Sequence, residues 1–296
     1  PDSIIFMKGY YNMDLTSPRT IRNIQEQFGF TFKKGLGQNF LTARNILEEI
    51  VDAAEIESGV IEVGPGFGVL TSELAQNSDK VVTIEIDERL IEVLDYTLAE
   101  YDNVKIINED ILKLDLKKVI DDEFNGEKVS IAANLPYYIT TPIITKLLEE
   151  KLPIKNIVVM VQKEVAERMS AKPSTKDYGA ITVLCQYYTE PSIVANVPAS
   201  LFVPPPKVDS AVLKLKVLDK PSVEVKDEGV FFRVVKAAFS QRRKTLLNCL
   251  SANFPIPKDE ISTLLESIGI APSRRGETLS LEEFANIADT LLQKIK

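Results

Sequence analysis

Short apolar runs alternate with longer amphipathic patterns along the chain from about residue 43 to residue 162. The apolar runs are rich in valine and isoleucine, which is typical of buried strands. The stretches between them repeat apolar residues at helical spacing. This alternation indicates βαβ units and therefore an α/β fold built on a parallel sheet. The predicted strands cover residues 60–63, 81–86, 104–108, 129–133 and 156–161.

Helical patterns flank these strands. One helix is expected before residue 60, with Thr42 as its N-cap. Further helices are expected from Glu73 onward, at 88–99 and at 142–148. The apolar face of the first helix consists of Ile46, Leu47, Ile50, Val51 and Ala54.

The pattern changes after the fifth strand. Residues 192–197 and 211–217 read as strands around a proline-rich corner, where a helix cannot continue. No strand pattern follows Leu218, and helices are predicted at 230–252, 258–267 and 281–294. We therefore expect three parts: an N-terminal extension at 1–32, an α/β domain at 33–219 and a small all-α domain at 220–296.

Composition excludes several classes of function. The chain has no histidine and two cysteines, Cys185 and Cys249, which rules out imidazole bases, histidine-ligated metals and a disulfide framework. We expect no bound metal. No apolar run approaches the ~20 residues of a membrane helix, and no signal peptide opens the chain. We expect a cytoplasmic monomer without a membrane partner. Residues 1–12 precede Met13, a natural start, and two alternatives stay open: these residues belong to the native protein or they are foreign to it.

The first strand runs into a glycine-rich turn, in the sequence VIEVGPGFG at residues 60–68. Glycines let a ligand approach the backbone, and the helix that follows offers free N–H groups. Glu85 ends the second strand, 21 residues after Gly64, where a carboxylate can hold the ribose hydroxyls of a nucleoside. Asp110 follows the third strand and can accept a hydrogen bond from an adenine amine.

The glycine spacing distinguishes between cofactors. Gly64, Gly66 and Gly68 form G-x-G-x-G, not the G-x-G-x-x-G of dinucleotide sites. We therefore expect S-adenosylmethionine rather than NAD. The alternative is a tight turn beside two solvated acids. Three strand ends that meet at one carboxyl edge favour the ligand site.

The sequence Asn-Leu-Pro-Tyr at residues 134–137 follows the fourth strand, which we expect beside the first. The oxygen of Asn134 and a backbone carbonyl of the proline turn can hold an exocyclic amine by its two hydrogens. Two such acceptors favour a pyramidal nitrogen whose lone pair points at a methyl donor. Tyr137 offers a face on which a flipped base could stack. The alternative is an ordinary turn, with Asn134 capping the next helix and Tyr137 in the core.

Six segments together resemble the ribosomal RNA adenine N6-dimethyltransferases, in particular their small-subunit branch. They extend from about residue 33 to residue 250. Tyr138 is a departure, because the family more commonly has asparagine there. The segments are GQNFL at 37–41, EVGPGFG at 62–68, IEID at 84–87, NLPYYITTP at 134–142, FVPPPKVDSAV at 202–212 and AAFSQRRKTL at 237–246.

The resemblance implies a Rossmann-like methyltransferase domain with a small C-terminal all-α domain that binds RNA. It implies transfer of methyl groups from S-adenosylmethionine to N6 of two adjacent adenosines, in a small-subunit rRNA hairpin of an assembling ribosomal particle, with S-adenosylhomocysteine as product. The implied cofactor contacts are Asn39, Leu41, Gly64, Gly66, Glu85, Asp110 and Asn134. The implied contacts to the target base are Asn134, Pro136, Tyr137 and Phe202, with Phe202 stacking opposite Tyr137.

Two other functions compete with this interpretation. The related macrolide-resistance methylases act on large-subunit rRNA. The corner at 202–212, the leucine after Asn134 and the net charge of −8 favour the small-subunit branch instead. An assembly factor whose binding matters more than its catalysis would use the same surface.

Positive charge is concentrated in one segment of this acidic chain. Residues 231–250 carry five basic residues and no acidic ones. Phosphate contacts need only such a local patch. We expect a basic helix here, with RNA contacts from Arg242, Arg243 and Lys244, and a second cluster at Lys33 and Lys34. The alternative is a solvated helix face.

Overall fold

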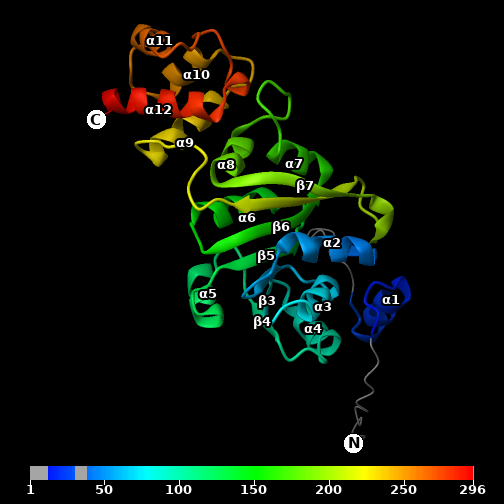
Figure 1. The fold of residues 1–296 in the computed structure, drawn as a ribbon. Helices are drawn as coiled ribbons and strands as arrows, with labels where there is room; N and C mark the ends of the chain where they lie inside the picture. Colours follow the sequence, from blue (N-terminus) through cyan, green and yellow to red (C-terminus); the bar gives the residue numbers. More distant parts are fainter. Residues whose placement is uncertain (1–12, 31–38, 296) are drawn as a thin grey trace, which may run out of the picture.

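A seven-stranded sheet forms the centre of the molecule in the computed structural model, which describes residues 13–30 and 39–295 (Figure 1). The strand order is β4-β3-β2-β5-β6-β9-β7. The first five strands in this order are parallel, and β9 and β7 extend them in antiparallel fashion. The strands are β2 (Val60–Val63), β3 (Val81–Glu85), β4 (Val104–Asn108), β5 (Val129–Asn134), β6 (Ile154–Gln162), β7 (Thr189–Val197) and β9 (Ser210–Val217).

The sheet confirms the predicted α/β fold and all seven predicted strands, with bounds that differ by three residues at most. The valine and isoleucine runs form strands because they are buried on both faces of the sheet. In β2 and β3 every residue is buried. Parallel strands require such two-sided burial, since helices cover both faces.

Two sets of helices cover the two faces of this sheet. Buried residues of one set share a hydrophobic cluster with Val60, and those of the other set share a cluster with Ile61. The first set is α1 (Pro18–Gln27), α2 (Arg44–Ala54), α3 (Val69–Gln76) and α4 (Ile91–Thr97), preceded by the 3-10 turn η2 (Glu88–Leu90). The second set is α5 (Leu116–Phe124), α6 (Thr140–Glu149), α7 (Lys163–Met169) and α8 (Ala180–Tyr188).

The sequence does not predict α5, α7 and α8. The α8 segment AITVLCQYY is rich in β-branched and aromatic residues, which favour strands. It is nevertheless helical, because six of its nine residues are buried between the sheet and the C-terminal helices. Tertiary packing here overrides local propensity.

A separate two-stranded ladder joins distant parts of the chain. Strand β1 (Phe40–Leu41) pairs antiparallel with β8 (Phe202–Val203), which follows the short turn η3 (Ala199–Leu201). The hydroxyl of Thr42 donates to the carbonyl of Leu201 at 2.8 Å. The prediction of Thr42 as N-cap of α2 is therefore wrong, because this position is Ala43 and Thr42 fastens the ladder instead.

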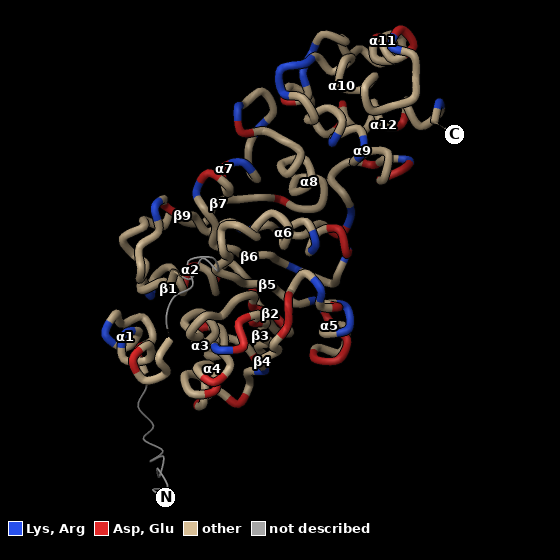
Figure 2. Tube along the Cα trace, turned by 180° about the vertical axis from the view of Figure 1, so that it is seen from behind, with Lys and Arg blue, Asp and Glu red and all other residues tan. Residues whose placement is uncertain are grey.

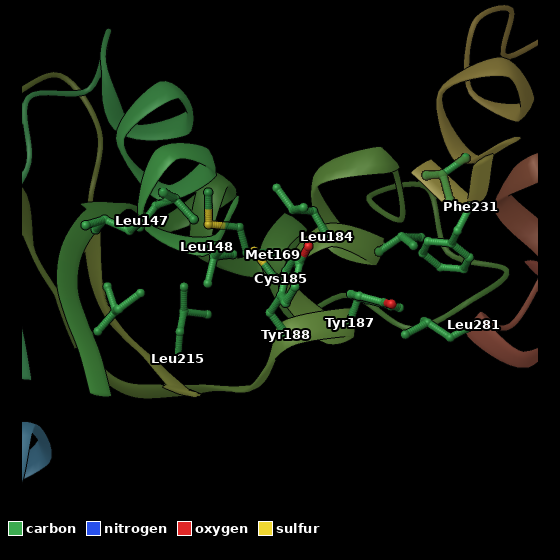
Figure 3. Packing of buried hydrophobic residues seen from close by; sticks show 14 of the residues in the cluster. Leu147, Leu148, Met169, Leu184, Cys185, Tyr187, Tyr188, Leu215, Phe231 and Leu281 are labelled. Carbon is green, nitrogen blue, oxygen red and sulfur yellow. The ribbon is translucent and has the colours of Figure 1, made fainter. Parts of the chain in front are cut away.

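Helices make up the chain after β9. They are α9 (Glu228–Ala238), α10 (Leu246–Asn253), α11 (Lys258–Ser267) and α12 (Leu281–Ile295), with η4 (Gly276–Thr278) between the last two. Their core is continuous with that of the sheet, since Tyr187 of α8 stacks on Phe231 of α9 with ring centroids 4.8 Å apart (Figure 3). The boundary at residue 220 stays a prediction. No helix in the described ranges has both the length and the apolar character of a membrane span.

The predicted single helix at 230–252 is wrong. The chain leaves the helical path after Ala238 and resumes it at Leu246. Ser240 turns its hydroxyl back to the carbonyl of Ala237, and Thr245 caps α10 by accepting from the N–H of Asn248. The basic run at 242–244 therefore forms an exposed turn, not a helix face.

The segment before residue 31 packs on the main domain. Ile21 and Ile24 of α1 are buried in the same cluster as α2, α3 and α4. Phe28 lies 5.5 Å from Tyr96, and Phe30 lies 5.3 Å from Phe67, measured between ring centroids. The described part of the predicted extension is thus integrated into the fold.

We expect Ile21→Ala to lower the free energy of unfolding by about 2–4 kcal/mol, because it removes a fully buried side chain and leaves a cavity. Arg22→Ala, at an exposed neighbouring position of the same helix, is the control and should change it by less than about 0.5 kcal/mol. Urea unfolding followed by circular dichroism suits this chain, which has no tryptophan. Equal midpoints for the two variants would show that α1 is not part of the cooperative unit.

Candidate active site

A pocket opens where β2, β3, β4 and β5 end. Because these strands are parallel and adjacent, their carboxyl ends meet at one edge. All seven predicted cofactor residues line this pocket, together with Pro136 from the Asn-Leu-Pro-Tyr loop. These seven are Asn39, Leu41, Gly64, Gly66, Glu85, Asp110 and Asn134.

The glycine turn is possible because Gly64, Gly66 and Gly68 all have positive φ values, of 70°, 59° and 83°. A Cβ atom at Gly66 would lie 2.8 Å from the ring of Phe40, so this glycine lets β1 approach the turn. A Cβ atom at Gly64 would meet nothing within 4 Å. Gly64 therefore borders open space in the pocket, where a side chain would compete with a ligand.

Glu85 is 5% exposed at the end of β3. Its Oε1 accepts a hydrogen bond from the backbone N–H of Asp87 at 2.7 Å. Burial raises the pKa of Glu85 to about 7, and the nearby Asp87 carboxylate adds to the rise while backbone N–H donors oppose it. A hydrogen-bond donor from a ligand would offset the cost of burying the charged Glu85 carboxylate.

Glu62 is a second buried carboxyl in the pocket, and it is not among the site residues predicted from the sequence. It is 1% exposed, and the hydroxyl of Thr71 donates to its Oε2 at 2.5 Å. Burial raises the pKa of Glu62 to about 8, and the charge of Glu85 contributes to the rise. The available signal is an acid within VIEV, a strand otherwise apolar on both faces.

Asp110 lies in the turn after β4. Its Oδ1 accepts a hydrogen bond from the backbone N–H of Leu112 at 3.0 Å, and its Oδ2 lies 3.7 Å from Nζ of Lys113. The described residues contain no cluster of three or more acidic or cysteine side chains with the geometry of a metal site.

Asn134 ends β5, directly beside β2, as predicted. Its Nδ2 donates to the backbone carbonyl of Asn39 at 3.0 Å. This bond uses one of the two N–H donors of the amide and orients the side chain, and Oδ1 can only accept a hydrogen bond. It also ties the β1 segment to the β5 loop.

The loop contains backbone carbonyls at Leu135 and Pro136, and that of Pro136 is already engaged within the loop. The carbonyl of Pro136 already accepts from the N–H of Ile139 at 3.1 Å and from the hydroxyl of Thr140 at 3.2 Å. A carbonyl oxygen has two lone pairs, and both are used here. Pro136 lines the pocket but contributes shape rather than an acceptor.

The two rings expected to stack on a base do not line this pocket. The hydroxyl of Tyr137 lies 2.9 Å from Oγ of Ser210, and burial raises its pKa. Phe202 is 3% exposed in the β1–β8 ladder. Tyr138, by contrast, lines the pocket and is 58% exposed. Stacking by Tyr137 and Phe202 stays a prediction that requires Phe202 to become accessible.

The basic residues lie away from the pocket. Arg242, Arg243 and Lys244 are exposed in the turn between α9 and α10. A terminal nitrogen of Arg242 donates to the carbonyl of Lys176, in the loop between α7 and α8. Lys33 and Lys34 lie outside the described residues.

Residues 29–293 match the family described as ribosomal RNA adenine dimethylase. The chain belongs to this family. The proteins named ribosomal RNA small subunit methyltransferase A from Bacillus mycoides (strain KBAB4) and Bacillus cereus (strain B4264) are 54% identical to it over 285 residues, which cover 94% of this chain and 98% of each relative.

Solved structures also resemble this dimethylase-family chain. A dimethyladenosine transferase from Plasmodium falciparum is 29% identical with a TM-score of 0.72, over 86% of this chain and 98% of that one. The 23S rRNA methyltransferase ErmE is 28% identical with a TM-score of 0.65, over 86% of this chain and all of its own. The predicted resemblance and the Rossmann-like methyltransferase fold are confirmed.

Glu62→Gln tests the burial of this carboxyl. Between pH 4.5 and about 8 the unfolded chain has released the proton of Glu62 while the folded chain still holds it, so stability falls as pH rises. From pH 5 to pH 8 the free energy of unfolding should fall by about 3 kcal/mol more in the unsubstituted protein than in Glu62→Gln. Urea titrations at several pH values measure this. Parallel curves would mean that Glu62 is charged in the folded protein.

Proposed function

We propose that the chain is an S-adenosylmethionine-dependent enzyme that methylates N6 of two adjacent adenosines in a small-subunit rRNA hairpin, giving N6,N6-dimethyladenosines during ribosome biogenesis. The observation that carries this proposal is the position of Asn134. Asn134 lines the same pocket as the glycine turn after β2 and the buried carboxyls of Glu62 and Glu85. A site for a nucleoside and a site for an amine would therefore lie side by side in this pocket.

The residues of the pocket fit S-adenosylmethionine. Glu85 can accept hydrogen bonds from two ribose hydroxyls, and Asp110 can accept one from the adenine amine. The ionised form of Glu85 suits a cationic ligand, whereas Glu62, with its pKa raised to about 8, keeps its proton at neutral pH. The open space beside Gly64 lets the ligand contact the backbone. When bound, S-adenosylmethionine supplies a methyl group on a sulfonium, which is an activated leaving group.

Asn134 and Leu135 can prepare the target amine. Oδ1 of Asn134 and the carbonyl of Leu135 would each accept one of the two N–H groups of an adenine N6. This draws the lone pair out of the ring and toward the methyl donor. The hydrogen bond from Asn134 to Asn39 fixes the amide before the substrate arrives, so no reorganisation is needed in the transition state. No imidazole base is required, in agreement with a chain that lacks histidine.

The similarity to the small-subunit methyltransferases favours small-subunit rRNA as the substrate. They are 54% identical to this chain, whereas the 23S rRNA methyltransferase ErmE is 28% identical. The large-subunit alternative predicts transfer to naked large-subunit RNA. The proposal predicts transfer to undermethylated small subunits.

RNA is expected to dock on a surface made by two loops. The turn at 242–244 and the loop with Lys172 and Lys176 lie on the same side of the molecule (Figure 2). The bond from Arg242 to the Lys176 carbonyl links them, and the N–H of Ser174 donates to the carbonyl of Glu277 at 2.7 Å. We call Lys172, Lys176, Arg242, Arg243 and Lys244 the basic surface. Its side chains are exposed and can contact phosphates.

Asn134→Ala should lower the rate of labelled methyl transfer to undermethylated small subunits by about 100- to 1000-fold, since it removes a contact that matters most in the transition state. The affinity for S-adenosylhomocysteine should fall only modestly, because Glu85 and Asp110 remain. Mapping of the methylated nucleotides identifies the substrate. Near-normal turnover would contradict the proposed role of Asn134, and wild-type transfer only to naked large-subunit RNA would favour the alternative.

Replacing Arg242, Arg243 and Lys244 by glutamine should weaken binding to the small subunit and reduce its salt dependence, by about 0.7–0.9 in the slope of log K against log salt for each phosphate that is no longer neutralised. Lys117 and Lys118 of α5 lie far from the basic surface, and their replacement by glutamine is the control (Figure 1). Binding is measured over a salt series, with a cofactor titration in parallel. An unchanged slope would mean that these residues form an ordinary solvated surface and do not contact phosphates.

A further inference from the structure

Arg89 lies near the cofactor pocket and contacts Asp87 and Phe30. Its Nε donates to Oδ1 of Asp87 at 2.8 Å and its Nη2 donates to Oδ2 at 2.5 Å, a two-pronged contact that fixes the plane of the guanidinium. The guanidinium carbon also lies 4.7 Å from the centre of the Phe30 ring. The short segment that follows α1 thus packs against the guanidinium through Phe30.

Asp87 connects this arginine to Glu85. Its backbone N–H donates to Oε1 of Glu85 at 2.7 Å, and its own carboxyl is buried. The charge of the Asp87 carboxylate opposes ionisation of Glu85 and contributes to the raised pKa of Glu85. A buried carboxylate without a cation would strengthen this opposition.

The other charges around Glu85 are mostly negative. From β2 it faces Glu62, and from the end of β4 Glu109 and Asp110 line the same pocket. Two cations are paired with this group of acids in the described structure. Lys113 is 3.7 Å from Asp110 with its side chain 78% exposed, so solvent screens its charge. The side chain of Arg89 is only 35% exposed, and it makes two hydrogen bonds to the carboxylate of Asp87.

We propose that Arg89 is a positioning residue of the cofactor site: it neutralises Asp87, and this lets the adjacent Glu85 carry its charge toward the ribose of the cofactor. The inference rests on the proposed role of Glu85 as a ribose ligand. Arg89 itself does not line the pocket and does not reach the ligand. It acts through Asp87.

The proposal predicts the direction in which cofactor affinity changes with pH. Glu85 binds ribose most strongly as a carboxylate, and its pKa in the free protein is raised to about 7. Cofactor affinity therefore falls as the pH falls through about 7. Without Arg89 the Asp87 carboxylate loses this two-pronged cationic contact, and its less compensated charge raises this midpoint further. At a pH well above the new midpoint Glu85 is charged in both proteins, and the difference in affinity disappears.

The experiment is calorimetric titration of the full chain with S-adenosylhomocysteine between pH 6 and pH 9. Arg89→Gln should bind about five- to sixfold more weakly at pH 7, with its midpoint raised by about one pH unit, and should match the wild type at pH 9. Arg89→Lys keeps the charge and should retain most of the wild-type profile. Affinity that is lower by the same factor at every pH would overturn the proposal and assign Arg89 a purely structural role.

Two further variants separate the possible causes. Arg233→Gln is the matched control, because Arg233 also lies over a phenylalanine ring, 4.4 Å from the centre of Phe254, but in the C-terminal helices. It should leave the whole profile unchanged. In a Glu85→Gln background the remaining pH dependence belongs to other groups such as Glu62, and adding Arg89→Gln should not shift it. A shift there would also overturn the proposal. If the wild type did not bind S-adenosylhomocysteine at any pH, the proposed function would fail, whereas wild-type binding with an unaltered Arg89→Gln profile rejects this inference alone.

Discussion

The site depends on the central position of β2, which is hydrogen-bonded to β3 on one side and to β5 on the other. Val63 is in register with Ile84 of β3 and with Ala133 of β5. The residues that follow on the three strands, Gly64, Glu85 and Asn134, therefore emerge at the same level of the sheet. A shift of one residue in either ladder would point the alternate side chain of that strand into the pocket. Backbone register thus brings the glycine turn, Glu85 and Asn134 to one edge of the sheet, next to one another.

Electrostatics divides the molecule into two regions. Acids surround the pocket, and two of them, Glu62 and Glu85, are buried with raised pKa values. Acids in their ionised form favour a cationic ligand over phosphate, whereas Glu62 keeps its proton up to about pH 8. The exposed cations of the basic surface lie at the other end of the chain's fold, on the loops near α7 and α10 (Figure 2). A net charge of −8 is therefore compatible with RNA binding, because the two regions meet different ligands.

Much of the sheet and the pocket could be predicted from the sequence because they rest on local signals. Valine and isoleucine runs identify β2, which glycines bound on both sides, and β3, and the acids at strand ends follow from parallel topology. The helix α8 could not be predicted, since only its burial makes a β-rich segment helical. The break at 239–245 could not be predicted either, because a serine and a threonine end and restart helices through hydrogen bonds that periodicity does not show. The occupied carbonyl of Pro136 and the clamp between Arg89 and Asp87 are matters of geometry, visible only in the folded chain.

The continuous core between the sheet and the C-terminal helices has a mechanical consequence. Tyr187 stacks on Phe231, Tyr188 donates a hydrogen bond to Glu228 at 2.5 Å, and Arg242 donates to the carbonyl of Lys176. Connections at three separate points leave the two parts little freedom to hinge. The distance between the basic surface and the pocket is therefore fixed by these contacts. Under the proposed function, an RNA that binds at both places would be selected by the distance between its phosphates and its target base, and the fixed geometry of the fold would discriminate between RNA shapes.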